Sequence, residues 1–84
     1  MNINIQVNDM KEAERLSIAC RKFPYELTLR AGNRLAADPK SLLGVLAMMY
    51  EDRRALSLNT GDLPDEYLSD FTQAISPFLP KAAA

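Results

Sequence analysis

Hydrophobic and polar residues alternate along several short stretches of the chain, and hydrophobic residues recur every three or four positions along the longer ones. Alternation is typical of half-buried strands, whereas the longer spacing is typical of amphipathic helices. The pattern predicts strands over 2–8, 25–30, 34–37 and 55–60, and helices over 10–22, over 40–50 and from Pro64 to about Phe78. The predicted order of elements is therefore βαββαβα.

Each predicted strand has a polar side, which argues against helices on both faces of the sheet. We therefore expect an α+β fold, an open-faced sandwich with a four-stranded antiparallel sheet and three helices on one face. The 84 residues suffice for one domain, residues 1–84, in which the tail 81–84 is expected to be frayed.

The first predicted helix has a clear beginning and a clear inward face. Asp9 precedes it and Glu12 follows three residues later, the spacing of a capping box. The residues expected to face inward are Ala13, Leu16, Ala19, Cys20 and Phe23. Ile18 falls on the opposite face beside Lys11, so we expect it to be an exposed apolar residue.

The helix over 40–50 has two candidate caps, and the closing helix has one. Either Asp38 or Ser41 caps the helix over 40–50, because both precede its first apolar residues. For the closing helix, Asp62 is the expected cap, and Pro64 is expected in the first turn. The inward residues of the closing helix are expected to be Leu68, Phe71, Ala74, Ile75 and Phe78.

Charge and composition exclude several classes of partner. The chain has 10 Lys and Arg against 11 Asp and Glu, so it lacks the basic excess of a nucleic-acid-binding protein. No apolar run approaches the length of a membrane span, and the first residues lack the pattern of a signal peptide. We therefore expect a cytoplasmic protein that binds neither membranes nor nucleic acid, with Cys20 as a buried thiol.

Histidine is absent from the whole sequence. Histidine is the commonest acid–base group and metal ligand of proteins near neutral pH. We therefore predict a binding or regulatory protein rather than an enzyme, with no metal or cofactor.

One segment resembles a known family. Residues 40–46 read Lys-Ser-Leu-Leu-Gly-Val-Leu, similar to the Lys-Ser-Ile-Met-Gly-Val-Met of HPr, the phosphocarrier protein of the bacterial sugar phosphotransferase system. The resemblance extends over about residues 3–79, with the same element order. Residues 21–23, Arg-Lys-Phe, are similar to the Ser-Lys-Phe/Tyr that closes the family's first helix. The resemblance implies the family's open-faced sandwich.

The carrier signature of that family is altered here. Where the family has Gly-Ile/Leu-His-Ala-Arg-Pro-Ala, residues 7–13 read Val-Asn-Asp-Met-Lys-Glu-Ala, so Asp9 occupies the position of the phosphorylated histidine. The family's relay needs an imidazole nitrogen, and the carboxylates of Asp9 and Glu12 would repel an incoming phosphate. The resemblance therefore implies a member without the histidine relay, or alternatively a divergent phosphocarrier that uses Asp9.

The family's second site is a regulatory serine, and Ser41 matches it. In lacking the histidine and keeping the serine, the chain resembles Crh, a family member that acts by binding a transcriptional regulator. The resemblance also implies a docking surface for a phosphotransferase component, a kinase or a transcriptional regulator. Its residues would be Leu42, Leu43 and Leu46, with Met10, Lys11 and Ile18 beside them. A structural or orphan protein that retains only the fold is the remaining alternative.

Overall fold

The computed structural model describes residues 2–32, 35–52, 56–61 and 63–80. The elements are β1 (Asn2–Ile5), α1 (Met10–Arg21), β2 (Thr28–Ala31), β3 (Leu35–Ala37), α2 (Leu42–Asp52), β4 (Leu56–Asn59) and α3 (Asp65–Ile75), followed by a 3-10 turn over Ser76–Phe78. The predicted βαββαβα order is confirmed. None of the helices in these ranges has the length and apolar character needed to cross a membrane.

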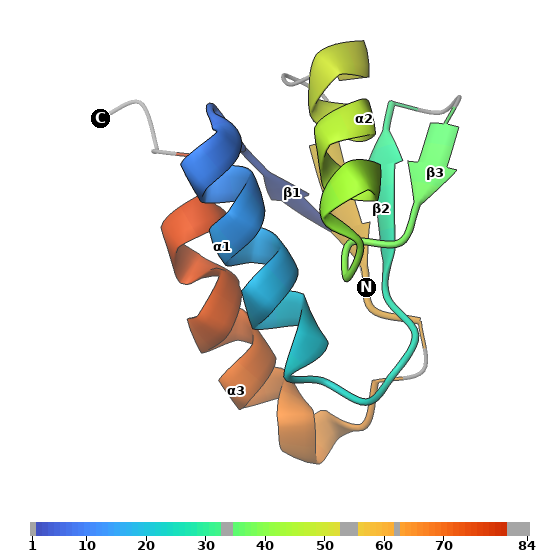
Figure 1. Cartoon of the computed structure of the whole chain (residues 1–84). Coiled ribbons are helices and arrows are strands. Elements are labelled where there is room, and N and C mark those ends of the chain that lie inside the picture. Colours follow the sequence, from blue (N-terminus) through green and yellow to red (C-terminus); the bar gives the residue numbers. More distant parts are fainter. Residues whose placement is uncertain (1, 33–34, 53–55, 62, 81–84) are drawn as a thin grey trace.

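The four strands form one antiparallel sheet in the order β1-β4-β2-β3. Ile5 lies opposite Leu56, and Leu29 lies opposite Leu58, so the apolar side chains of neighbouring strands share one face. The three helices lie over that face, and the other face of the sheet is left uncovered (Figure 1). The predicted open-faced α+β sandwich is confirmed.

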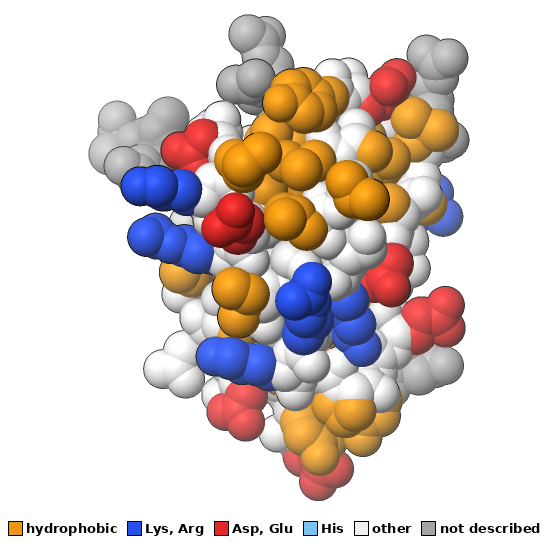
Figure 2. Space-filling model, viewed as in Figure 1, with side chains coloured by type: hydrophobic (Ala, Val, Ile, Leu, Met, Phe, Trp, Pro, Cys, Tyr) orange, Lys and Arg blue, Asp and Glu red, His pale blue; other side chains and the backbone are white. Residues whose placement is uncertain are grey.

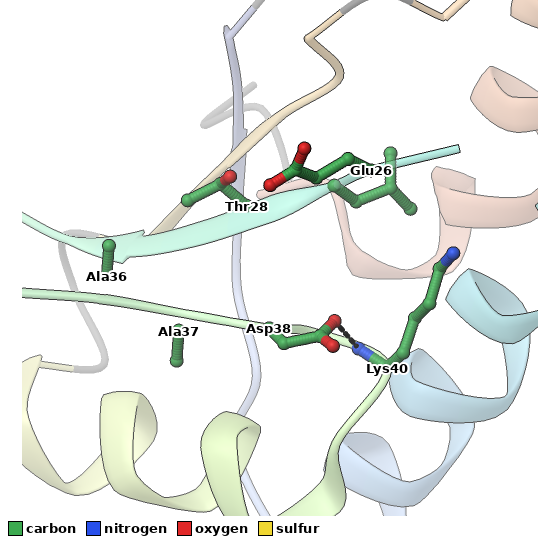
Figure 3. Close-up of a pocket in the computed structure, with 7 residues that line it drawn as sticks. Glu26, Thr28, Ala36, Ala37, Asp38 and Lys40 are labelled. Atoms are coloured by element: carbon green, nitrogen blue, oxygen red, sulfur yellow. Dashed lines mark hydrogen bonds between the residues drawn. The ribbon is translucent and has the colours of Figure 1, made fainter. Parts of the chain in front are cut away.

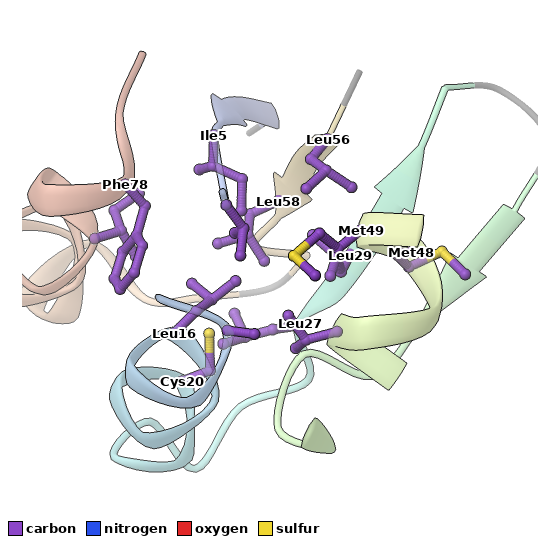
Figure 4. Packing of buried hydrophobic residues seen from close by; sticks show 14 of the residues in the cluster. Ile5, Leu16, Cys20, Leu27, Leu29, Met48, Met49, Leu56, Leu58 and Phe78 are labelled. Carbon is purple, nitrogen blue, oxygen red and sulfur yellow. The ribbon is translucent and has the colours of Figure 1, made fainter. Parts of the chain in front are cut away.

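The core lies between the helices and the sheet (Figure 4). Phe71 of α3 is the largest fully buried side chain, and its ring packs edge-on against Phe23 with the ring centroids 5.2 Å apart. Leu16 and Cys20 of α1 are also fully buried. The inward face predicted for α1 is thus confirmed, except that Ala19 is only half-buried.

Three strands are shorter than their sequence pattern, and one of them, β4, ends at Asn59 instead of residue 60. Strand β1 ends at Ile5 rather than at residue 8, because the Gln6 N–H donates to the Phe78 carbonyl, 2.6 Å away, instead of to a neighbouring strand. Strand β2 begins at Thr28 rather than at residue 25, because its partner β4 ends at Asn59. Alternation reports which side chains are buried, whereas a strand also needs a partner for its backbone.

The two ends of the closing helix also differ from expectation. Helix α3 begins at Asp65, with Pro64 at the N-cap position rather than in the first turn, and it ends at Ile75 before the 3-10 turn. The predicted cap Asp62 and the tail 81–84 lie outside the described residues.

Candidate functional site

The side chains predicted to dock a partner lie on α1 and α2, and several of them face solvent. Leu43 is 79% exposed, Ile18 55% and Met10 54%, and Lys11 is exposed as well. Leu42 and Leu46 are half-buried and pack against the core. We call Met10, Lys11, Ile18, Leu42, Leu43 and Leu46 the docking surface.

The docking surface spans both helices. Helices α1 and α2 are in contact, and Ile18 and Leu42 line one shallow cavity of about 160 Å³ with Arg21. Figure 2 shows hydrophobic side chains gathered on the face that carries α1 and α2, with basic side chains beside them. The fold therefore brings together apolar residues that are more than twenty positions apart in the sequence.

Two residues of α2 extend this apolar area, and the sequence reasoning missed them. Tyr50 is 76% exposed and Ala47 is exposed. They follow Leu43 by seven and four positions, so all three lie on one side of the helix. Their spacing in the sequence indicates that the three residues share one side of the helix. Because almost all of α2 is apolar, the spacing does not indicate which side faces water.

Ser41 caps α2. Its hydroxyl oxygen accepts a hydrogen bond from the Gly44 N–H at 3.3 Å, and its carbonyl accepts from the Val45 N–H at 3.0 Å. The other candidate, Asp38, closes the preceding turn instead, because its carboxylate accepts from the Lys40 N–H at 2.9 Å. Ser41 is exposed, so its hydroxyl lies at the surface beside the first residues of α2.

Close packing at the start of α2 explains why a glycine stands at position 44. A Cβ on Gly44 would lie 2.9 Å from the Asp38 carbonyl oxygen and 3.3 Å from the Ala37 Cβ. The absence of a side chain therefore lets the first turn of α2 approach the end of β3 and place Ser41 there.

Lys40, the residue before Ser41, is held at both its backbone and its side chain. Its carbonyl accepts from Ser17 Oγ at 3.0 Å and from Arg21 Nε at 2.9 Å. Its ammonium Nζ donates to the Tyr25 carbonyl at 2.9 Å. Lys40 therefore joins the start of α2 to α1 and to the chain before β2. No sequence signal predicts the roles of Ser17 and Arg21, because their partner is a backbone carbonyl 23 and 19 residues away.

Asp9, which the resemblance places at the position of the carrier histidine, is the N-cap of α1. Its backbone is extended, and its Oδ1 accepts from the Glu12 N–H at 2.8 Å. The Glu12 carboxylate accepts from Asn8 Nδ2 at 3.4 Å. The predicted cap at Asp9 is confirmed, but the second bond of a capping box is replaced, because the Glu12 carboxylate accepts from the Asn8 side chain and not from the Asp9 N–H. No cluster of three or more His, Cys, Asp or Glu side chains that could hold a metal ion occurs within the described ranges.

Replacing Asp9 by Ala is expected to lower the free energy of unfolding by about 1 kcal/mol, because the Glu12 N–H loses its acceptor. Asn is an equally good cap, so Asp9→Asn is the matched control and should retain most of the stability. Urea denaturation of the three proteins measures the difference. Equal stability of Asp9→Ala and the wild type would show that the cap contributes nothing.

A second depression lies where β2 and β3 meet the start of α2. It has a volume of about 440 Å³, and its polar side chains are Glu26, Thr28, Asp38 and Lys40 (Figure 3). Asp38 is engaged with the Lys40 backbone, and Lys40 with Tyr25. Two of the charged residues of this depression, Asp38 and Lys40, thus hold the turn that precedes Ser41.

Cys20 is buried in the core, and its burial raises the pKa of the thiol to about 12. Among nearby charges, Lys40 acts to lower that pKa and Asp38 to raise it, both more weakly than burial. The prediction of a buried thiol is confirmed, and at neutral pH this thiol is protonated.

Comparison with protein-family models, with curated proteins and with solved structures gives no significant match to this chain.

Proposed function

We propose that this chain is a non-enzymatic regulatory protein of the cytoplasm that binds a protein partner through the docking surface. The observation that carries the proposal is the exposure of Leu43, Met10 and Ile18 on adjoining helices, extended by Tyr50. Apolar side chains that adjoin one another on the surface of a small protein mark interaction sites more often than scattered single residues do. The resemblance of residues 40–46 to HPr, in which the corresponding residues dock partners, supports the same proposal.

Phosphorylation of Ser41 is the proposed switch. Its hydroxyl is exposed and lies at the N-terminus of α2, next to Leu42 and Leu43 of the docking surface. A phosphate dianion at a helix N-terminus is electrostatically favourable. The modification would place about two negative charges at the rim of an apolar surface. A partner with basic side chains at that position would then bind better, and a partner with acidic ones would bind worse.

Leu43→Asp is expected to abolish partner binding without unfolding the chain. Leu43 is 79% exposed and lies in the first turn of α2, where a carboxylate is favourable. Ser69→Asp is the matched control, because it adds the same charge at an exposed position of α3. The probe is the transcriptional regulator that histidine-free members of the HPr family bind, titrated calorimetrically with each protein, both unmodified and treated with the family's serine kinase.

The result expected is at least a tenfold weaker affinity for Leu43→Asp, equivalent to about 1.4 kcal/mol, and an unchanged affinity for Ser69→Asp. Equal affinities of Leu43→Asp and the wild type would overturn the docking surface. Mass spectrometry after kinase treatment should find one phosphate, on Ser41. A hydroxylamine-labile phosphate on Asp9, formed with phosphoenolpyruvate and the first enzyme of the phosphotransferase system, would support the phosphocarrier alternative instead.

A further inference from the structure

Two basic side chains, those of Arg21 and Lys40, lie near Ser41 in the fold, but they donate hydrogen bonds to different backbone carbonyls. The Lys40 ammonium is committed to the Tyr25 carbonyl, 15 residues back in the chain. The Arg21 guanidinium donates through Nε to the Lys40 carbonyl, which belongs to the peptide group joining Lys40 to Ser41. Arg21 therefore reaches the backbone of position 41 from α1, whereas the lysine adjacent in sequence is held elsewhere.

The bond to Lys40 anchors the Arg21 guanidinium through Nε, and its other N–H groups donate to no residue within the described ranges. Arginine has five N–H donors in a rigid plane, and the Nε donor alone is used in the bond to the Lys40 carbonyl. The Ser17 hydroxyl donates to the same carbonyl, so that oxygen stays satisfied if the guanidinium shifts. A planar guanidinium can donate two parallel hydrogen bonds to phosphate oxygens, whereas the Lys40 ammonium would have to leave the Tyr25 carbonyl to reach them.

We infer that Arg21, and not Lys40, is the residue that pairs with a phosphate on Ser41. This inference rests on the proposed switch at Ser41 and names the residue through which it acts. Arg21 also lines the cavity that contains Ile18 and Leu42. The ion pair therefore forms beside the cavity that Ile18 and Leu42 line in the docking surface. It connects the phosphate at the start of α2 to a side chain of α1.

The test uses the full chain with phosphoserine installed at position 41 by genetic-code expansion. The readout is the second ionisation of the phosphate, followed by phosphorus NMR against pH. That pKa is about 6 for free phosphoserine, and a paired guanidinium lowers it because the pairing favours the dianion. This readout reports charge pairing at the phosphate itself, which a purely structural role of Arg21 would not move.

Arg21→Gln is expected to raise the phosphate pKa by about 0.5 unit, the size typical of an exposed ion pair. Lys40→Gln is the matched control, with the same loss of charge, and is expected to shift the phosphate pKa by less than half as much. Arg21→Lys should restore part of the effect, and amide spectra confirm that each variant is folded. An unchanged pKa in Arg21→Gln, or an equal shift in Lys40→Gln, would overturn the inference while leaving the docking proposal standing.

Discussion

Phe71→Ala is expected to lower the free energy of unfolding by about 3–5 kcal/mol, because it removes a fully buried ring and leaves a cavity. The Phe71 ring stabilises the fold by more than its buried area alone predicts, because it also packs edge-on against Phe23 with the ring centroids 5.2 Å apart. A domain of this size has a total stability of about 5–15 kcal/mol, so the variant loses a large share of it.

Urea denaturation followed by circular dichroism measures this loss. Gln73→Ala is the matched control, because position 73 is exposed two residues along the same helix and should change stability by less than about 0.5 kcal/mol. A loss below about 1 kcal/mol for Phe71→Ala would mean that α3 is not packed on the core as described.

The second large expected effect is a loss of folding stability at alkaline pH, caused by the Cys20 thiol. Burial raises the pKa of the Cys20 thiol from its ordinary value of 9.0 to about 12, so the folded state holds this proton more tightly than the unfolded state. The contribution of the protonated Cys20 thiol to the free energy of unfolding is therefore fully present below pH 9, and it is lost as the pH rises from 9 towards 12. The loss is at most about 1.4 kcal/mol for each pH unit.

Comparison with Cys20→Ala isolates the contribution of this one thiol to the free energy of unfolding, because the two chains are otherwise identical. The wild type and the variant should differ by a constant free energy of unfolding below pH 9, and the difference should shrink above it. Denaturation at a series of pH values between 7 and 11 provides the measurement. Two parallel curves over the whole range would show that the thiol titrates normally in the folded state.

The sequence predicted the order of the elements and the inward face of α1 well, because the spacing of apolar residues depends on local geometry. The period of α1 predicted that Leu16 and Cys20 are buried and that Ile18 is exposed, and the structure confirms all three. Asp9 was predictable as a cap for the same reason, since its hydrogen-bond partner Glu12 is three residues away.

Strand ends were less predictable, because they depend on partners distant in sequence. Nothing near Gln6 indicates that its N–H will donate to Phe78 rather than to a strand. The candidate docking residues were chosen from the resemblance, and burial alone separates the exposed Leu43 from the half-buried Leu42 and Leu46. Tyr50 was missed because α2 is apolar on most of its circumference, so its period does not select one outer face.

The sequence by itself determined the order of the elements, the buried face of α1, and the cap of α1. All of these follow from side chains within a few residues of one another. Local residue types left two candidates for the cap of α2, and the structure selects Ser41 while Asp38 closes the preceding turn. Only the tertiary structure decided that Ser17 and Arg21 hold the Lys40 carbonyl. A backbone carbonyl has the same chemistry at every position, so its partners are chosen by the packing of helices and not by the residues around it.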